Sequence, residues 1–256
     1  MMATGPYVKF LPNLLASMKE HFLTNHDVHV HVFTDQVEHV ITEFQVEAHF
    51  IQHDPNKKWY PTVDRFNIFR KYYGELDGYD NYVYIDSDSL ITDTVDDELL
   101  GERVYVQHCG FLHKMGTYDR NPLSSCYVED GWEKLQHQLK ECQDVDEKLK
   151  LRKIEKNFVR PTYVAGSIWS FSRDEFWRFI DTACDMLASD LERRILPLWA
   201  DESIINRYAL DNPPTTLLNP SYHYPQKDII RDDCWTDEDK VSYPCKILQL
   251  QKALYI

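Results

Sequence analysis

Two aspartates separated by one serine follow directly on an apolar stretch, in the segment YVYIDSDSL at residues 82–90. One interpretation is a strand that ends in a polar turn. The other is a strand whose end delivers Asp86 and Asp88 to a metal ion and a phosphorylated ligand. Hard carboxylate oxygens at this spacing suit Mg²⁺ or Mn²⁺, which in turn bind a diphosphate. The aspartates alone do not separate the two interpretations, so the elements around them must.

The first ninety residues alternate between helical and strand patterns. Apolar residues at helical spacing predict helices over residues 12–24 and 63–76. Alternating or continuous apolar residues predict strands over 28–34 and 81–86. This alternation favours an α/β layered sheet, and in open sheets of this kind ligands bind beyond the carboxyl ends of the strands. The two aspartates would lie at one such end.

The second half of the chain opens with a segment of different character. Residues 131–160 are rich in charge and carry apolar residues at helical spacing, which predicts an amphipathic helix or a helical pair. We expect this segment to lie on the surface of the domain, with a dimer contact or a lid as alternatives. Strand character returns at 163, where Gly166 suggests that a ligand approaches the backbone closely. Ser172 and Glu175 have the spacing of a capping box before the next helix.

The composition argues against several classes of protein. A formal net charge of −14 disfavours nucleic-acid binding and docking on an anionic membrane. The chain has no run of eighteen apolar residues and no signal peptide, so we expect no transmembrane segment in it. None of the six cysteines is paired at CxxC spacing, so neither a zinc motif nor a redox motif is indicated.

Three longer segments resemble glycosyltransferase family 6, the family of the histo-blood-group A and B transferases and the α-1,3-galactosyltransferases, which also has soluble bacterial members. Residues 21–36 (HFLTNHDVHVHVFTDQ) are similar to the family's HFM-x-x-H-x-V-x-x-YVFTDQ segment. Residues 117–128 (TYDRNPLSSCYV) are similar to TYERRP-x-S-x-AYI. Residues 195–225 resemble the WHDES-x-xNKY stretch with its PT-x-x-LSPEY continuation. The resemblance covers nearly the whole chain.

The resemblance implies a fold and an activity. We expect residues 1–256 to form one α/β domain of the GT-A type, a Rossmann-like mixed sheet flanked by helices with a helical insertion at 131–160. Its first strand and its C-terminal tail would be truncated. The implied reaction moves galactose or N-acetylgalactosamine from UDP-galactose or UDP-N-acetylgalactosamine to a glycan hydroxyl, with retention and in an α-1,3 linkage. The implied cofactor is Mn²⁺, with Mg²⁺ as the alternative.

The resemblance also assigns roles to residues. Glu202 matches the family's catalytic glutamate, and a carboxylate below the sugar ring serves retention as a nucleophile or as a stabiliser of an oxocarbenium-like centre. Asp86 and Asp88 would hold the metal. His108, in HCGF where the family has HPGF, and Trp199 would contact the acceptor sugar. The implied donor site comprises Ala3, Thr4, Tyr7, Arg65, Asp86, Asp88, Ala165, Gly166, Ser167 and Asp201.

Departures from the family pattern leave alternatives open. Ala200 stands where the blood-group type members have histidine, so the acceptor is not implied. Ser170 and Phe171 replace a Gly-Gly pair, and Lys246 and Lys252 are the basic candidates for a tail that closes over UDP. One alternative is a catalytically degenerate member that binds a glycan or a protein partner, and another is a glycogenin-like UDP-glucose transferase. The chain as given predicts a cytoplasmic, bacterial-like protein, or one of the Golgi lumen if an N-terminal anchor is missing.

Overall fold

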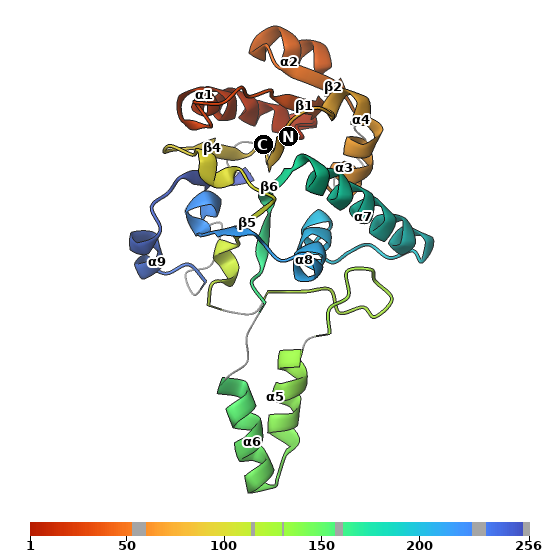
Figure 1. The fold of residues 1–256 in the computed structure, drawn as a ribbon, viewed down its shortest axis with the longest axis vertical. Helices are drawn as coiled ribbons and strands as arrows, with labels where there is room; N and C mark the ends of the chain where they lie inside the picture. Colours follow the sequence, from red (N-terminus) through yellow and green to blue (C-terminus); the bar gives the residue numbers. More distant parts are fainter. Residues whose placement is uncertain (53–59, 114–115, 130, 157–160, 227–233, 253–256) are drawn as a thin grey trace.

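A computed structural model of the chain describes residues 1–256 except 53–59, 114–115, 130, 157–160, 227–233 and 253–256 (Figure 1). The strands are β1 (His31–Thr34), β2 (Glu47–Phe50), β3 (Asn81–Ile85), β4 (Ser89–Ile91), β5 (Arg103–Gln107), β6 (Val164–Ser172), β7 (Thr216–Leu218), β8 (Tyr224–Pro225) and β9 (Ile247–Gln249). The α-helices are α1 (Leu11–His21), α2 (Val37–Phe44), α3 (Tyr60–Lys71), α4 (Tyr73–Leu76), α5 (Gly131–Glu141), α6 (Val145–Lys156), α7 (Arg173–Glu192), α8 (Asp201–Asp211) and α9 (Asp237–Ser242). Short 3₁₀ helices are η1 (Gly5–Phe10), η2 (Asp97–Leu99), η3 (Cys109–Phe111) and η4 (Pro220–His223).

The central sheet is mixed and has the strand order β3-β6-β5-β7. Strand β6 pairs antiparallel with β3 and with β5, and β5 pairs parallel with β7. Strands β1 and β2 form a separate parallel pair, and β4, β9 and β8 form a small three-stranded sheet. The molecule is therefore mixed α/β with sheets flanked by helices, which is the fold class that the sequence predicts.

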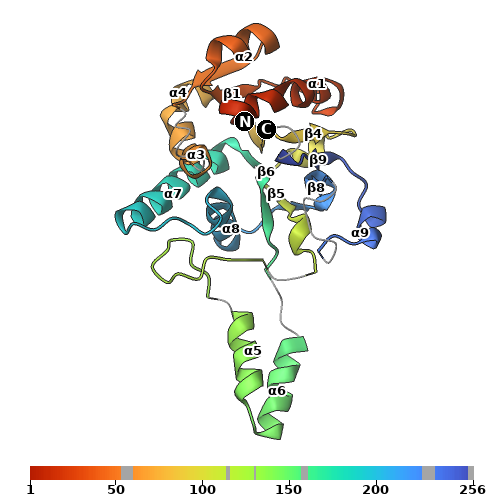
Figure 2. The same cartoon turned by 180° about the vertical axis from the view of Figure 1, so that it is seen from behind.

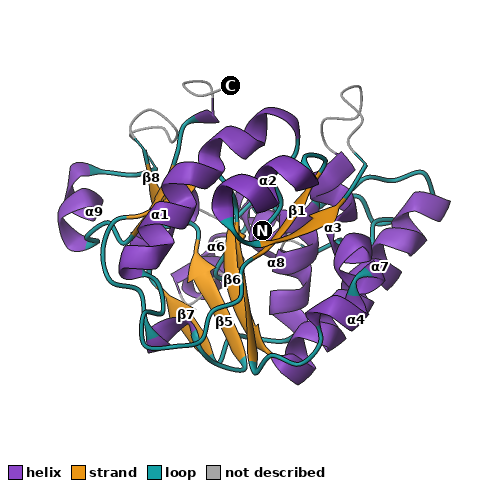
Figure 3. Cartoon of the chain, turned by 90° about the horizontal axis from the view of Figure 1, so that it is seen from above, coloured by secondary structure: helices purple, strands orange, loops and turns teal. Residues whose placement is uncertain are grey.

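Two cores cover the two faces of the central sheet, because successive side chains of a strand point to opposite faces. Trp169 and Phe171 of β6 pack into one core with residues of α3, α7 and α8. Ile168 of the same strand packs into the other core with residues of α1 and β4. Seen from above, β5 and β6 run between α1 on one side and α3, α7 and α8 on the other (Figure 3). Because both faces of the sheet are packed, the residues at the ends of its strands have well-defined positions.

Two predicted elements differ in extent from those observed. The helix predicted over 63–76 is divided into α3 and α4, because Tyr72 between them leaves helical geometry with φ −98° and ψ 25°. The strand predicted over 28–34 starts only at His31, where pairing with β2 begins.

The capping box predicted at Ser172 and Glu175 is wrong. Ser172 is the N-cap residue of α7, but its side chain makes no capping hydrogen bond. Glu175 is buried, and its carboxylate accepts a 2.7 Å hydrogen bond from Tyr208 Oη and pairs with Arg178. The buried hydroxyl of Tyr208 needs a hydrogen-bond partner. Glu175 provides it, so its carboxylate links α7 to α8 and does not cap the N-terminus of α7.

The segment 131–160 contains a helical pair, α5 and α6, which is one of the two forms predicted. The helices pack on each other through Leu135, Leu139 and Leu151. Figures 1 and 2 show the pair projecting from the body, so the prediction that it lies on the domain surface is wrong. These three leucines are buried between the two helices, whereas Leu149 is exposed. Residues 130 and 157–160 lie outside the described part of the chain.

Within the described part of the chain, no helix is both long enough and apolar enough to span a membrane. Helix α7 is the longest of the described helices at 20 residues, and it carries acidic residues along its whole length.

Candidate active site

A cleft of about 740 Å³ opens where the end of β3, the start of α8 and both ends of the described chain meet. Eleven of the thirteen predicted site residues line it: Thr4, Tyr7, Arg65, Asp86, Asp88, His108, Gly166, Ser167, Trp199, Asp201 and Glu202. The other two, Ala3 and Ala165, are fully buried. A second cleft, of about 540 Å³ and lined in part by His29 and Tyr79, contains none of the thirteen.

Arg65 of α3 connects the two acidic clusters of the cleft. Its Nη1 lies 2.8 Å from Asp201 Oδ2, and its Nη2 lies 3.7 Å from Asp86 Oδ1. The guanidinium also lies over the ring of Tyr84, 4.5 Å from the centroid, and Tyr84 donates a 2.5 Å hydrogen bond to Asp86 Oδ1. Burial opposes the charge on Arg65, but the surrounding Asp201, Tyr84 and Asp86 outweigh it and raise the pKa of Arg65. The arginine is therefore a permanent buried cation that holds α3, α8 and the end of β3 together.

The DSD segment follows immediately on β3, as predicted. Asp86 donates its backbone N–H to the carbonyl of Ser167 on β6 (2.8 Å), which fixes the segment to the central sheet. Asp88 is buried, and its burial and the nearby charge of Asp86 raise its pKa to about 6. Two carboxylates with oxygen donors at a strand end fit a hard divalent cation such as Mn²⁺ or Mg²⁺.

The ends of the described chain close one side of this acidic corner. Lys252 Nζ lies 3.3 Å from Asp88 Oδ2 and 5.4 Å from the ring centroid of Tyr7. Thr4 lies beside them in the cleft wall, just before η1. Of the two basic candidates in the tail, Lys252 lies in the cleft, whereas Lys246 pairs with Glu98 at 2.8 Å.

Glu202 lies in the first turn of α8 and points at β6. Its Oε2 accepts a 2.9 Å hydrogen bond from the backbone N–H of Gly166. A Cβ at Gly166 would come within 2.9 Å of Glu202 Cβ, so the strand admits only glycine at this position without movement of the carboxylate. Gly166 was predicted to allow close approach of a ligand to the backbone. In the structure the close neighbour is the side chain of Glu202.

Asn206, one turn further along α8, fixes the helix to β6. Its side chain accepts from the backbone N–H of Val164 and donates to the carbonyl of the same residue, both at 2.8 Å. This paired contact sets the height of α8 relative to the strand, and with it the position of Glu202.

Asp201 sits next to Glu202 but is almost wholly buried. Burial is the largest influence on it and raises its pKa to about 7, although Arg65 acts in the opposite direction. Asp86 and Glu202 raise it further. Burial is thus the main cause of the raised pKa of both Asp88 and Asp201, and neighbouring carboxylates add to it.

The turn before α8 is strained. Ala200, the N-cap residue, has φ 51° and ψ −124°, a combination that an L-residue with a Cβ rarely adopts. The turn directs Trp199 outward, with half of its surface exposed at the cleft. It is fixed on the other side by Asp119, whose Oδ2 accepts from the backbone N–H of Leu198 at 3.2 Å.

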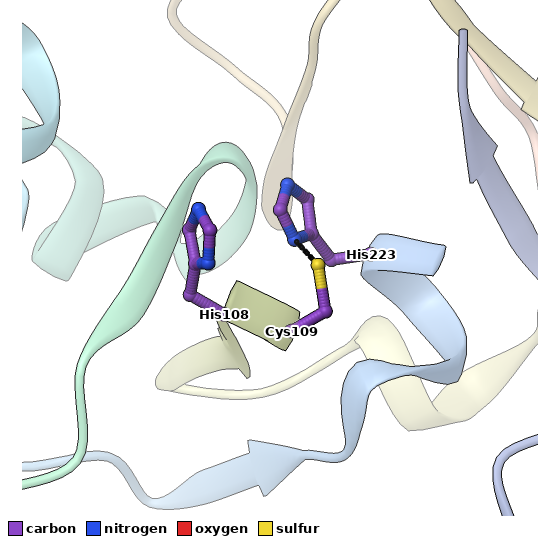
Figure 4. A group of neighbouring side chains, drawn as sticks. All are labelled: His108, Cys109 and His223. Atoms are coloured by element: carbon purple, nitrogen blue, oxygen red, sulfur yellow. Dashed lines mark hydrogen bonds between the residues drawn. The ribbon is translucent and has the colours of Figure 1, made fainter. Parts of the chain in front are cut away.

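His108 lies at the far end of the cleft, close to two residues that the sequence did not single out. Cys109 follows it in η3, and His223 ends η4; Cys109 Sγ lies 3.3 Å from His223 Nδ1, and the two imidazole rings are 4.6 Å apart (Figure 4). Burial raises the pKa of the Cys109 thiol. Burial and the neighbouring His108 lower the pKa of His223 well below its usual value, so both groups are neutral near pH 7.

The sequence of the chain was compared with protein families and with known proteins. The model of glycosyltransferase family 6 matches residues 1–136, which is more than half of the chain. The chain belongs to glycosyltransferase family 6. It is similar to globoside alpha-1,3-N-acetylgalactosaminyltransferase 1 of Homo sapiens, with 21% identity over 87% of the chain and 59% of that protein. It is also similar to histo-blood group ABO system transferase 1 of Rattus norvegicus, with 25% identity over 89% of the chain and 60% of that protein. The chain thus spans about three fifths of the length of these relatives.

Several residues that hold the site of this family 6 protein together are not revealed by its motifs. Tyr84, the penultimate residue of β3, reads as an ordinary strand residue in the segment YVYIDSDSL. In the structure it contacts both Arg65 and Asp86. Cys109 and His223 likewise carry no local signal of their contact. Asn206 stands at the asparagine of the WHDES-x-xNKY segment, but that motif does not show that its side chain bonds the backbone of Val164. Their roles follow from contacts between segments that are far apart in the sequence.

We predict that Ala200→Gly stabilises the protein. Removing the Cβ relieves backbone strain of about 1–3 kcal/mol, while the greater freedom of glycine in the unfolded chain offsets about 0.5–1 kcal/mol. The expected net gain is about 1 kcal/mol in the free energy of unfolding, measured by chemical denaturation.

Ala209→Gly is the matched control, because Ala209 lies inside the same helix with ordinary geometry. That change should destabilise the protein by about 1 kcal/mol. If both glycine variants lose stability to the same degree, the turn at Ala200 is not strained.

Proposed function

We propose that this protein is a retaining α-hexosyltransferase that moves galactose or N-acetylgalactosamine from a UDP-sugar to a hydroxyl of a glycan, in an α-1,3 linkage. The observation that carries the proposal is the meeting of two acidic clusters in one cleft. Asp86 and Asp88 come from the end of β3, Asp201 and Glu202 come from the start of α8, and Arg65 lies between them.

The donor nucleotide would occupy the end of the cleft near the DSD segment. Thr4 and Tyr7 would contact the uracil, with Ala3 packed behind them. Asp86 and Asp88 would hold Mn²⁺, or Mg²⁺ in its place. When bound, such a cation offsets the negative charge that develops on the leaving diphosphate. Lys252 would contribute a further positive charge at the same end.

The sugar would lie in the cleft beside Ser167 and Glu202. Ser167 and Gly166 form the floor of the cleft beside Glu202, with Ala165 buried below them. The hydrogen bond from Gly166 N–H holds Glu202 Oε2 in place, so that its carboxylate faces the sugar as nucleophile or as stabiliser of positive charge at the anomeric carbon. Asp201, held by Arg65, would bind donor hydroxyls.

The acceptor would enter from the opposite end. The half-exposed indole of Trp199 offers a flat apolar face on which a sugar ring can stack. His108 lies in the wall of the same cleft.

The proposal predicts that UDP binding depends on Mn²⁺ and on Asp88. Asp88→Asn removes one anionic oxygen ligand, and we expect the Mn²⁺-dependent part of UDP affinity to fall by more than about 10-fold, since even changes around metal ligands cost about 10–100-fold. Isothermal titration of UDP with and without Mn²⁺ measures this.

Asp27→Asn is the control, because the Asp27 side chain is 96% exposed and lies outside the cleft. Equal UDP affinity in the parent and Asp88→Asn, with and without metal, would show that the donor site has been placed wrongly.

The Mn²⁺ affinity should also depend on pH. A protonated carboxyl cannot act as a ligand, and the pKa of Asp88 is raised to about 6. We therefore expect the affinity to be steady above about pH 7 and to fall by about tenfold per unit below about pH 6, because binding then displaces one proton. Titration of Mn²⁺ between about pH 5 and 8, followed by electron paramagnetic resonance, measures the dependence. A constant affinity over this range would mean that Asp88 is not a ligand.

Glu202→Gln separates an enzyme from a glycan-binding protein. The amide oxygen of glutamine can still accept from Gly166 N–H, so the fold and UDP binding should be retained. Turnover of UDP-galactose or UDP-N-acetylgalactosamine should fall by at least about 100-fold, because the charge beside the anomeric carbon is lost. Product formation by chromatography measures it, with the exposed Glu192→Gln as control.

Two outcomes of this assay would replace the proposal. Glycan binding without any turnover in the parent would indicate a catalytically degenerate family member. Turnover of UDP-glucose in preference to both other donors would indicate a glycogenin-like specificity.

A further inference from the structure

Three side chains at the far end of the cleft bring two imidazoles and one thiol together. His108 and Cys109 are adjacent at the start of η3, and His223 is the last residue of η4. One ligand atom from each lies within 4.8 Å of the other two. Figure 4 shows the two rings side by side and tilted relative to each other, with the sulfur of Cys109 beside the ring of His223.

The spacing resembles the first shell of a tetrahedral metal ion. A zinc ion bound by sulfur at about 2.3 Å and by nitrogen at about 2.05 Å places these two atoms about 3.5 Å apart. Cys109 Sγ and His223 Nδ1 are 3.3 Å apart. Small movements of the side chains would therefore suffice to place a cation between them.

The protonation of His108 is compatible with this arrangement. Its Nδ1 accepts a 3.0 Å hydrogen bond from the backbone N–H of Gly110, so this nitrogen carries a lone pair and not a proton. Ligation through Nδ1 would replace that hydrogen bond. Cys109 is a free thiol, and it is fully buried at the base of the group.

We propose that His108, Cys109 and His223 bind a thiophilic divalent cation such as Zn²⁺. Nitrogen and sulfur donors suit Zn²⁺ and Co²⁺, whereas the carboxylates of the DSD segment suit Mn²⁺ and Mg²⁺. All three residues are among those that line the cleft, and His108 is the partly exposed one, so a cation would enter past His108. Three protein ligands would leave the fourth position of a tetrahedral ion for water or another ligand. None of these three residues belongs to the DSD segment, although all five line the same cleft, and the proposal does not depend on the transferase activity.

Co²⁺ is the probe that tests this proposal, because a cobalt–thiolate bond gives a charge-transfer band that oxygen and nitrogen ligands do not give. We expect the full chain, kept reduced with a non-chelating phosphine, to develop this band at one equivalent of Co²⁺. Added Zn²⁺ should abolish it, since Zn²⁺ takes the same site. Cys109→Ser should remove the band.

His223→Gln should weaken Co²⁺ binding by more than about 10-fold. Cys245→Ser is the matched control, because Cys245 is a free, partly buried thiol outside the cleft, and it should leave the band unchanged. The double variant Asp86→Asn with Asp88→Asn should also keep the band, even where Mn²⁺-dependent UDP binding is lost.

Absence of the band in the parent, its persistence in Cys109→Ser, or its loss in the double aspartate variant would each overturn the proposal. Circular dichroism establishes that the variants are folded. If Cys109→Ser does not fold, His108→Gln and His223→Gln carry the test, and unchanged Co²⁺ affinity in both would overturn the proposal.

Discussion

The buried ion pair between Arg65 and Asp201 is the interaction on which the cleft depends. Burying a charge without a partner is strongly unfavourable, and here one guanidinium is shared between the end of β3 and the start of α8. Four carboxylates line the cleft, and Arg65 and Lys252 are the two permanently basic side chains among its lining residues. Two formal negative charges are left over. One divalent cation at the DSD segment would neutralise them when all four carboxylates are ionised, that is, above the raised pKa values of Asp88 and Asp201.

A second constraint acts on distance and not on charge. Asn206 fixes α8 to β6 through two backbone hydrogen bonds, and Gly166 leaves the space that Glu202 occupies. The Glu202 carboxylate is therefore held at a fixed distance from β6, and no side chain at position 166 displaces it. Contacts on both sides of the turn keep Ala200 in its strained backbone conformation. Asp119 binds the backbone of Leu198 before it, and α8 is fixed to β6 after it.

The sequence was most informative where chemistry and local structure coincide. A strand pattern followed by DSD predicted the place of Asp86 and Asp88, and a helical pattern after Trp199 predicted the place of Glu202. The pairing of Arg65 with Asp201 could not be predicted from spacing, because it joins residues 136 positions apart through the packing of α3 against α8. The same holds for Cys109 and His223. The prediction of a capping box was wrong for a related reason, since the Glu175 carboxylate accepts a hydrogen bond from the hydroxyl of Tyr208 on α8, which is distant in the sequence.

The two ends of the cleft differ in the kind of atom they offer a cation. At any one site of nitrogen, oxygen or sulfur ligands, Zn²⁺ generally binds more tightly than Mn²⁺. A pair of carboxylates alone would therefore not exclude Zn²⁺ from the donor end. On the proposed assignment, the imidazoles and thiol at the other end attract Zn²⁺ more strongly than the carboxylates do. When Zn²⁺ is present at no more than one equivalent, it would therefore occupy the site beside His108 and leave Asp86 and Asp88 to Mn²⁺.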